Sequence, residues 1–404
     1  MIKSLKEFVI IGGGAAGMFA ALAAKAANPS ACVVLLEKSA VLLAKVRVSG
    51  GGRCNVTHAC FDPRELIRHY PRGNKELLGP FHRFQPKDTL SWFEKRGVIL
   101  KTEPDGRMFP VTDSSQTIID CLTKEARDLG IEIRFKQKIE AIRAHENQFE
   151  IAFEGGEVLH TLKLLLATGS NPEGHRWARQ LGHSIQDPVP SLFTFNIPDF
   201  ELAHLSGIPW GPVEVTLPNT HLSQTGPLLI THFGFSGPAV LKLSAWAAHF
   251  LHACNYHSPV VINWLPAFNE EALFKQLRAA KVKHPSQTAA GANPLRLPKN
   301  LWHALLKGTA ENKLLSFTDK QLRALSQKLH HDVYHIGGKT THKEEFVMCG
   351  GISLNEIDFK TLQSKICPGL YFAGEILDID GVTGGFNFQN AWTTSYIAGT
   401  HACS

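Results

Sequence analysis

The residues best suited to chemistry come early in the chain, where glycines stand at the spacing of Gly12, Gly14 and Gly17. Residues 7–11 before them are mostly apolar, as in a buried parallel strand, and the alanine-rich residues 18–27 favour a helix. Gly12 permits a tight turn, Gly14 lets a pyrophosphate approach the backbone, and Gly17 lets helix and strand pack closely. Because the helix N-terminus also offers free N–H groups, the pattern predicts a dinucleotide-binding turn.

An acidic residue follows this unit at the expected distance. Residues 32–36 form a second apolar strand, and Glu37 comes directly after it, 20 residues beyond Gly17. A carboxylate at this place accepts hydrogen bonds from ribose hydroxyls and disfavours a 2′-phosphate. The sequence therefore predicts FAD or NAD rather than NADP, with Glu37 and its neighbour Lys38 at the adenosine.

Two later segments favour FAD over NAD. Residues 162–169 form an apolar strand ending in Ala-Thr-Gly, which resembles the mid-chain turn of flavoproteins. Residues 369–375 form a strand that closes with Gly374 and Glu375, and in flavoproteins an acid here, usually Asp, holds a ribityl hydroxyl. Residues 384–390 lead into a helix whose N-terminus would stabilise negative charge on a reduced flavin. An ordinary glycine loop is the alternative for that last segment.

The sequence lacks a second G-x-G-x-x-G. Residues 337–340 resemble the end of a P-loop, but Val333 stands where that motif requires glycine. We therefore expect no separate nicotinamide domain, and NAD(P)H would visit the flavin transiently.

The most specific motif is the run Lys-Val-Arg-Val-Ser-Gly-Gly-Gly-Arg-Cys-Asn-Val-Thr at residues 45–57. Together with residues 231–240, 350–351 and 369–390, it resembles the BaiN/RdsA (YhiN-like) family of NAD(P)/FAD-dependent oxidoreductases. The matching segments span almost the whole chain.

The resemblance implies an α/β fold with three parts. These are a discontinuous Rossmann-like FAD-binding domain (1–188 and 344–404), an inserted β-barrel-like domain (189–268) and a small basic helical domain (269–343). The sequence agrees, since residues 193–196, 213–217 and 260–264 predict short strands between Pro and Gly turns. Thr318 and Gln321 have the spacing of a capping box at a helix start.

The resemblance also places the glycine-dense loop 49–55 at the cofactor. Arg53 in this loop would meet the pyrophosphate or a substrate anion, or else is an ordinary surface arginine. The full set of predicted cofactor-binding residues is Gly12, Gly14, Ala15, Ala16, Gly17, Glu37, Lys38, Lys45, Ser49, Gly50, Gly51, Gly52, Arg53, Thr168, Gly169, Gly374, Glu375, Gly384, Gly385, Phe386 and Asn387.

Cys54 and His232 are the catalytic candidates. Hydride would leave flavin N5 for the β-carbon of an unsaturated carbonyl compound, and a thiol such as Cys54, protonated at neutral pH, would protonate the α-carbon. The alternative is a small buried cysteine that packs the loop. His232 would donate to a substrate carbonyl or is structural, and Asn387 and Gln389 would pair with the flavin edge or the substrate.

Composition excludes several classes of protein. The 404 residues are 44% hydrophobic, which is enough for a full core and argues against disorder. We find no transmembrane or signal-peptide pattern and expect a cytoplasmic protein without membrane contact. None of the eight cysteines forms Cys-x-x-Cys, and no histidine pair has a ligand partner at metal spacing, so we predict no metal site.

Positive charge is concentrated in residues 269–343, which carry 13 Lys and Arg against 5 Asp and Glu, although the whole chain has a net charge of only +6. The basic residues are Lys275, Arg278, Lys281, Lys283, Arg296, Lys299, Lys307, Lys313, Lys320, Arg323, Lys328, Lys339 and Lys343. This insert would steer a polyanion, or is a solvated helical face. Aromatic residues do not alternate regularly with these basic residues, so the sequence does not suggest base stacking.

Three functions remain open from the sequence, and the oligomeric state is unknown. The first is an FAD-dependent reductase of an activated C=C bond that uses NAD(P)H. Relatives in the family are assigned either to small molecules such as bile-acid intermediates or to uridine in ribosomal RNA, and the basic insert favours RNA. The second is an amine-type oxidase. The third is a non-catalytic FAD-binding or RNA-associated protein.

Overall fold

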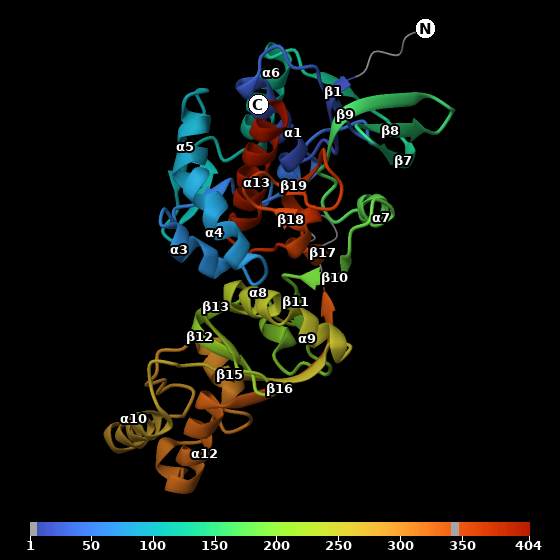
Figure 1. Cartoon of the computed structure of the whole chain (residues 1–404). Coiled ribbons are helices and arrows are strands. Elements are labelled where there is room, and N and C mark those ends of the chain that lie inside the picture. The colour runs from blue at the N-terminus through green and yellow to red at the C-terminus, as the bar shows by residue number, and fades with distance from the viewer. Residues whose placement is uncertain (1–5, 341–346) are drawn as a thin grey trace. The chain divides into compact units, whose positions relative to one another are not determined.

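The computed structural model describes residues 6–340 and 347–404 (Figure 1). Its contacts form two compact units, which we treat separately. Unit 1 comprises residues 1–190 with 343–404, and unit 2 comprises residues 191–342. The domain boundary that we predict between residues 343 and 344, and the basic residue Lys343, lie outside the described residues.

Unit 1 is built on a sheet whose strands run in the order β18-β19-β20-β9-β1-β2-β6. Its parallel core consists of β1 (Lys6–Ile11), β2 (Val33–Leu36), β6 (Glu132–Arg134), β9 (Val158–Leu166) and β20 (Leu370–Phe372). The short strands β18 (Ile357–Asp358) and β19 (Gln363–Ser364) add an antiparallel edge, and β7 (Ile139–His145) and β8 (Gln148–Phe153) extend β9. All four residues of β2 are buried, as expected for a central parallel strand.

Two helices pack against one another beside this sheet. They are α1 (Ala15–Ala27) and α13 (Phe386–Cys403), which join the start of the chain to its end. A Cβ added at Gly399 of α13 would lie 2.2 Å from the carbonyl oxygen of Ala20 in α1, so only glycine allows this approach. The helices therefore place the residues after β20 next to the β1–α1 turn.

The remaining elements of unit 1 surround this core. The helices are α2 (Ala44–Val48), α3 (Pro63–Leu66), α4 (Asn74–Arg83), α5 (Pro86–Glu94), α6 (Ser115–Asp128) and α7 (Pro172–Gln180). A small sheet joins β3 (Thr57–His58), β5 (Arg107–Pro110) and β4 (Leu100–Thr102), and β10 (Ile185–Ser191) pairs with β17 (Val347–Ile352).

Unit 2 contains a closed six-stranded barrel. Its strands follow the order β11 (Thr194–Asn196), β14 (Gly234–Ser236), β13 (Leu222–Ile230), β12 (Pro209–Leu217), β15 (His257–Asn263) and β16 (Asp332–Thr340). Its helices are α8 (Pro238–Trp246), α9 (Ala248–Ala253), α10 (Glu270–Lys283), α11 (Lys299–Leu305) and α12 (Asp319–His330). The predicted fold class, a Rossmann-like α/β protein with an inserted barrel and helices, is confirmed.

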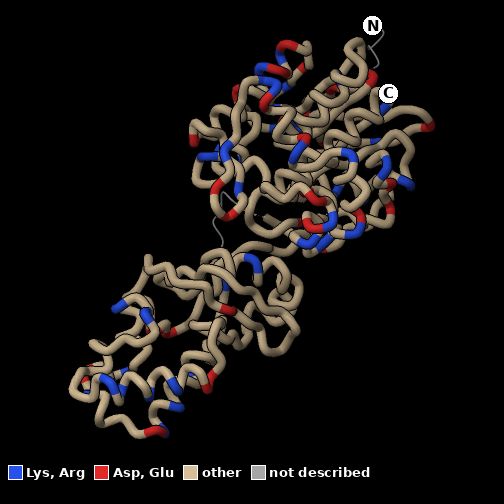
Figure 2. Tube along the Cα trace, turned by 90° about the vertical axis from the view of Figure 1, so that its left-hand side faces the viewer, with Lys and Arg blue, Asp and Glu red and all other residues tan. Residues whose placement is uncertain are grey.

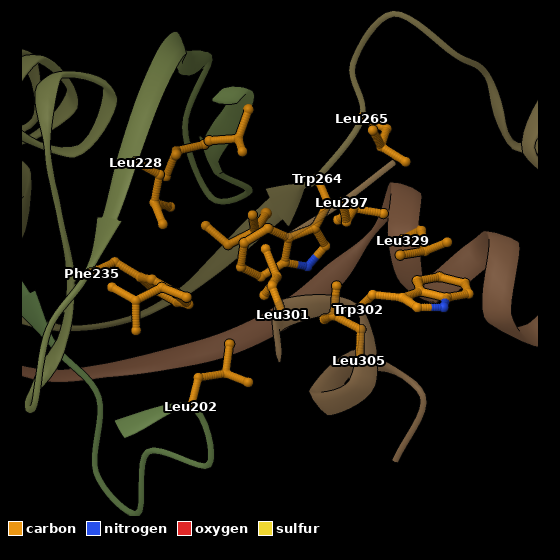
Figure 3. Close-up of a cluster of buried hydrophobic side chains, with 14 of the residues drawn as sticks. Leu202, Leu228, Phe235, Trp264, Leu265, Leu297, Leu301, Trp302, Leu305 and Leu329 are labelled. Atoms are coloured by element: carbon orange, nitrogen blue, oxygen red, sulfur yellow. The ribbon is translucent and has the colours of Figure 1, made fainter. Parts of the chain in front are cut away.

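Barrel and helices share one hydrophobic cluster (Figure 3). Phe235 and Trp264 come from the barrel, and Trp302 and Leu329 come from the helices, all fully or almost fully buried. The expectation that residues 269–343 are helical is wrong for β16, which returns after α12 and pairs with β15 and β11. This strand closes the barrel, so the barrel is complete only when the chain has passed through the helices.

The predicted capping box is present at the start of α12. The backbone N–H of Gln321 donates to Thr318 Oγ1 at 3.2 Å, and the backbone N–H of Thr318 donates to Gln321 Oε1 at 2.8 Å. Two otherwise orphaned backbone donors are thereby satisfied.

Candidate functional site

The β1–α1 turn has the geometry of a phosphate cradle. Gly12 has a φ of +112°, and a Cβ there would lie 2.4 Å from the carbonyl oxygen of Ala167. A Cβ at Gly17 would lie 1.9 Å from the carbonyl oxygen of Gly12, so both positions require glycine. At Gly14, the N-cap of α1, a Cβ would meet nothing within 4 Å. The turn is therefore closed on the side of the sheet and open at the N-terminus of α1, where Ala15 and Ala16 form the first turn.

Glu37 ties the end of β2 to this turn. Its Oε2 accepts a hydrogen bond from the backbone N–H of Gly13 at 2.7 Å, and its Oε1 accepts one from Ser39 N at 2.8 Å. The exposed Lys38 lies with its Nζ 3.7 Å from Glu173 Oε2 in α7. The structure thus brings Glu37 to the glycine turn, while Lys38 faces another element.

A second group of predicted residues meets around Glu375. Its Oε2 lies 2.5 Å from Lys45 Nζ, and its Oε1 accepts a hydrogen bond from the backbone N–H of Met348 at 3.2 Å. A Cβ added at Gly169 would lie 3.4 Å from Glu375 Oε2. Segments far apart in the sequence, from α2, the end of β9 and the end of β20, therefore converge here.

Two further residues of this region lie between these groups. A Cβ at Gly374, whose φ is +76°, would lie 2.8 Å from Cβ of Ala16, which links the Glu375 region to the first turn of α1. Thr168 Oγ1 is buried and has no hydrogen-bond partner within the described part of the chain. A buried hydroxyl without a partner is costly unless a ligand or water satisfies it.

The loop after α2 contains three successive glycines with left-handed backbone, since Gly50, Gly51 and Gly52 have φ values of +58°, +68° and +84°. Ser49 Oγ donates to the carbonyl oxygen of Val46 at 2.9 Å and so fixes the start of the loop. Cys54 also has a positive φ of +60°, which is rare for a residue with a side chain, and it is fully buried. Burial raises the pKa of the Cys54 thiol to about 12, so the thiol stays protonated at neutral pH.

Arg53 is held by protein groups on the surface of unit 1. It donates to Glu103 Oε1 at 2.6 Å, lies 3.5 Å from Asp113 Oδ1, and places its guanidinium 4.0 Å from the ring centroid of Phe109. These contacts explain its position without a ligand, so its predicted role at the pyrophosphate stays a prediction.

The glycines before α13 form a tight turn. Gly384 and Gly385 have φ values of +132° and +93°, and a Cβ at Gly385 would lie 2.6 Å from the carbonyl oxygen of Thr57. Asn387 donates to, and accepts from, the backbone of Gly381, with both bonds at 2.8 Å. The Asn387 amide is therefore engaged in shaping the loop from within the protein.

Phe386 is almost fully buried within a stack of rings. The imidazoles of His58 and His69 lie over it, with centroids 4.6 and 4.3 Å away and interplanar angles of 27° and 14°. Tyr70 donates its hydroxyl to the carbonyl oxygen of Phe386 at 2.6 Å. The region that we expected at the flavin is thus braced by side chains from residues 58–70.

Sequence reasoning missed one buried ion pair in this region. Arg72 and Asp380 form a two-pronged ion pair, with Arg72 Nε 2.5 Å from Asp380 Oδ1 and a second N–H on Oδ2. Gln389, which we named as a candidate for the flavin edge or the substrate, is fully buried, and its Oε1 accepts hydrogen bonds from Thr57 and Thr89 at 2.6 and 3.0 Å. Partners 300 or more residues apart leave no spacing signal in a single sequence.

His232 lies in unit 2, whereas every other predicted site residue lies in unit 1. It occupies the turn between β13 and β14, and its imidazole is exposed. Within the described ranges, no cluster of three or more His, Cys, Asp and Glu side chains is arranged to hold a metal ion. Over the same ranges, we find no helix with both the length and the apolar character needed to cross a membrane.

Comparison with known proteins identifies the family. The sequence profile of the HI0933-like protein Rossmann domain matches residues 6–401. The chain belongs to this family. The finding confirms the resemblance to the BaiN/RdsA group, and the chain is accordingly an enzyme of the FAD-dependent oxidoreductase class.

Two curated relatives of the HI0933-like chain match nearly full length. The ribosomal RNA dihydrouridine synthase of Escherichia coli (strain K12) is 31% identical over 407 residues, covering 96% of each chain. The 3-dehydro-bile acid delta(4,6)-reductase of Clostridium scindens is 28% identical over 411 residues, covering 97% of this chain and 98% of its own.

Solved structures show the same fold. The 3-ketosteroid-delta4-(5alpha)-dehydrogenase of Rhodococcus jostii RHA1 superposes with a TM-score of 0.53 at 13% identity, over 100% of this chain and 98% of its own. The residues of this chain fit a dinucleotide cofactor. A Cβ at Gly14 would meet nothing within 4 Å, and the buried Thr168 hydroxyl has no hydrogen-bond partner among the described residues.

Proposed function

We propose that the protein reduces an activated C=C bond with electrons from NAD(P)H, and that its substrate is uridine in ribosomal RNA, which becomes 5,6-dihydrouridine. The observation that carries this proposal is the similarity, over 96–98% of this chain, to two proteins named ribosomal RNA dihydrouridine synthase, from Escherichia coli and Haemophilus influenzae. Identity of 30–31% over that length spans both units rather than the nucleotide-binding turn alone.

The residues of unit 1 would hold FAD as follows. The open backbone at Gly14 and the N-terminus of α1 would receive the pyrophosphate, and Glu37 would accept the ribose hydroxyls. Glu375, which Lys45 pairs with, would accept a ribityl hydroxyl. Bound FAD would supply hydride transfer between NAD(P)H and C6 of the uracil. Reduction is complete when C5 receives a proton.

Cys54 is our candidate for that proton transfer. Its raised pKa keeps the thiol protonated at neutral pH. Because the side chain is fully buried, the transfer requires that binding of cofactor and substrate opens a path to the thiol. His232 is exposed on unit 2, and its role as a donor to a substrate carbonyl stays a prediction. The role of Cys54 is tested by the Cys54→Ser variant described below.

The charge of unit 2 supports an RNA substrate. The unit carries 13 Lys and Arg against 8 Asp and Glu, a net charge of +5 (Figure 2). Several exposed cations have no ion pair among the described residues, namely Lys275, Lys283, Arg296, Lys299, Lys313 and Lys320. Others are neutralised, such as Lys307, whose Nζ lies 2.8 Å from Glu201. Uncompensated cations release counterions from a phosphate backbone and strengthen its binding.

The test is mass-spectrometric quantification of dihydrouridine in ribosomal RNA from cells with and without this gene. Loss of the modification, restored by the wild-type gene, is the expected result. Purified protein with NADH or NADPH should then form dihydrouridine in unmodified ribosomal RNA. Unchanged dihydrouridine in the deletion strain, together with no product in vitro, would refute the proposal.

A matched pair of variants tests the charge argument. Lys283→Glu should weaken RNA binding and reduce the steepness of its salt dependence, because an unpaired cation is lost. The double variant Lys307→Gln with Glu201→Gln removes an ion pair that has no net charge and should leave binding unchanged.

A second candidate function is reduction of a small unsaturated ketone. The similarity to the bile-acid reductase of Clostridium scindens favours it. Turnover of such a ketone with NAD(P)H, with no effect of the gene on ribosomal RNA, would select this alternative. Fast reoxidation of the reduced protein by oxygen with release of peroxide would instead favour an oxidase.

A further inference from the structure

An aromatic side chain projects from the turn between β13 and β14. Phe233 is 63% exposed, and no other Phe, Tyr or Trp in the described ranges is exposed to this extent. Most phenylalanines of unit 2 are buried. Examples are Phe235 of β14 and Phe195, its partner on β11. Exposing this much apolar surface to water costs free energy, so the exposure of Phe233 calls for a functional explanation.

The turn that carries Phe233 is rigid. The backbone N–H of Phe233 donates to Thr231 Oγ1 at 3.3 Å, and its carbonyl accepts from Ile197 N at 2.8 Å. Thr231 N donates to the carbonyl oxygen of Gly234 at 2.9 Å. Gly234 has a φ of +147°, and a Cβ there would lie 2.1 Å from the carbonyl oxygen of Phe195, so no other residue type fits. The exposed ring therefore projects from a fixed backbone.

The neighbouring His232 does not cover the faces of the Phe233 ring. The ring of His232 lies with its centroid 6.5 Å from that of Phe233 at an interplanar angle of 70°, which is an edge contact. Residues 215–269 contain no Asp or Glu. The segment that bonds to the Phe233 carbonyl through Ile197 carries two carboxylates, Asp199 and Glu201, of which Glu201 is paired with Lys307. A single aromatic plane on a unit of net charge +5 suits a polyanion with exposed flat groups.

We infer that Phe233 stacks on an unpaired base of the RNA and thereby holds a single-stranded segment against unit 2. This inference rests on the proposed function and adds to it the recognition of unstacked nucleotides. An RNA duplex keeps its bases stacked within the helix, so the contact selects loops and single strands. A neutral ring adds no counterion release, so its contribution is independent of salt.

The experiment measures binding of a short uridine-containing single-stranded RNA by fluorescence anisotropy. Phe233→Ala should weaken binding by about 10-fold, within the range that loss of one aromatic–base stack produces. Phe233→Tyr retains an aromatic plane and should bind like the wild type. Phe61→Ala, which removes a phenylalanine 46% exposed in unit 1, is the matched control and should also bind like the wild type.

Two further readouts sharpen the test. The salt dependence of Phe233→Ala should be parallel to that of the wild type, and its affinity for a fully paired RNA of the same sequence should be unchanged. Equal affinity of Phe233→Ala and wild type for the single strand would overturn the inference. Since the ring is largely exposed, the variant should keep the thermal unfolding profile of the wild type.

Failure of the inference and failure of the proposed function can be told apart. Dihydrouridine formation by the wild type with equal RNA binding by Phe233→Ala would refute the inference alone. No dihydrouridine from the wild type with any donor, but weaker single-strand binding by Phe233→Ala, would refute the proposed substrate and uphold the stacking contact. Loss of turnover with a small unsaturated ketone, without loss of RNA binding, would overturn the inference by assigning Phe233 to a small ligand.

Discussion

Removing the carboxylate of the buried Arg72–Asp380 pair should destabilise unit 1 strongly. Asp380 is fully buried, and the side chain of Arg72 is 15% exposed. Both prongs of the guanidinium meet the carboxylate, and the two residues also form a backbone bridge. The substitution Asp380→Asn keeps the shape of the side chain but removes the negative charge that both prongs of the Arg72 guanidinium meet.

The expected magnitude follows from this geometry. Loss of one partner of a buried ion pair costs about 3–5 kcal/mol, because the remaining charge stays desolvated. For a unit the size of unit 1, this corresponds to a fall in Tm of roughly 6–20 °C. The double variant Arg72→Met with Asp380→Leu removes both charges and should be more stable than Asp380→Asn.

The assay is thermal and urea unfolding of the three proteins, followed by intrinsic fluorescence. Asp128→Asn is the control, since it removes the carboxylate of the exposed Lys124–Asp128 pair and should give no measurable shift. A double variant less stable than Asp380→Asn, or an Asp380→Asn variant that unfolds like the control, would refute the argument that the buried charge needs its partner.

Three further predictions follow from the site and the core. Gly14→Ala should preserve the thermal stability of the apoprotein but lower the FAD bound per chain, whereas Gly17→Ala should lower both, since its Cβ meets the Gly12 backbone. Cys54→Ser should strongly reduce turnover at unchanged flavin content, and unchanged turnover would remove Cys54 as the proton donor. Burial lowers the pKa of His183, which is 2% exposed. Its neutral form is therefore favoured in the folded state, so stability is highest above about pH 6.5 and falls as the pH drops towards the lowered value. His183→Gln should flatten this loss in urea titrations, and an unchanged profile would contradict it.

The sequence predicted those parts of the protein in which neighbours along the chain determine the structure. The turn at Gly12–Gly17 needs only its flanking strand and helix, and each glycine requirement appears in the backbone as expected. The capping box of Thr318 and Gln321 spans a single helical turn. In both cases, the physical requirement lies within about twenty residues.

The features that the sequence did not predict depend on contacts between residues far apart along the chain. β16 alternates polar and apolar residues weakly, and its strand character follows from β15 and β11, to which it bonds. The partners of Asp380 and Gln389 lie 300 or more residues earlier in the chain. A buried carboxylate or amide needs a donor, but a single sequence does not say which donor the fold supplies.

Several side chains predicted to bind the cofactor bond to other groups of the protein instead, which bears on how the cofactor is held. The Asn387 amide bonds to Gly381, Arg53 bonds to Glu103, and Glu375 lies against Lys45. By contrast, an added Cβ at Gly14, the N-cap of α1, would meet nothing within 4 Å, so the backbone there has room for a ligand. Backbone N–H groups suit phosphates, and their position depends on the fold rather than on rotamers. We therefore expect Gly14→Ala to reduce flavin binding more than Arg53→Gln or Asn387→Ala does, and equal losses in flavin titrations would contradict a mainly backbone cradle.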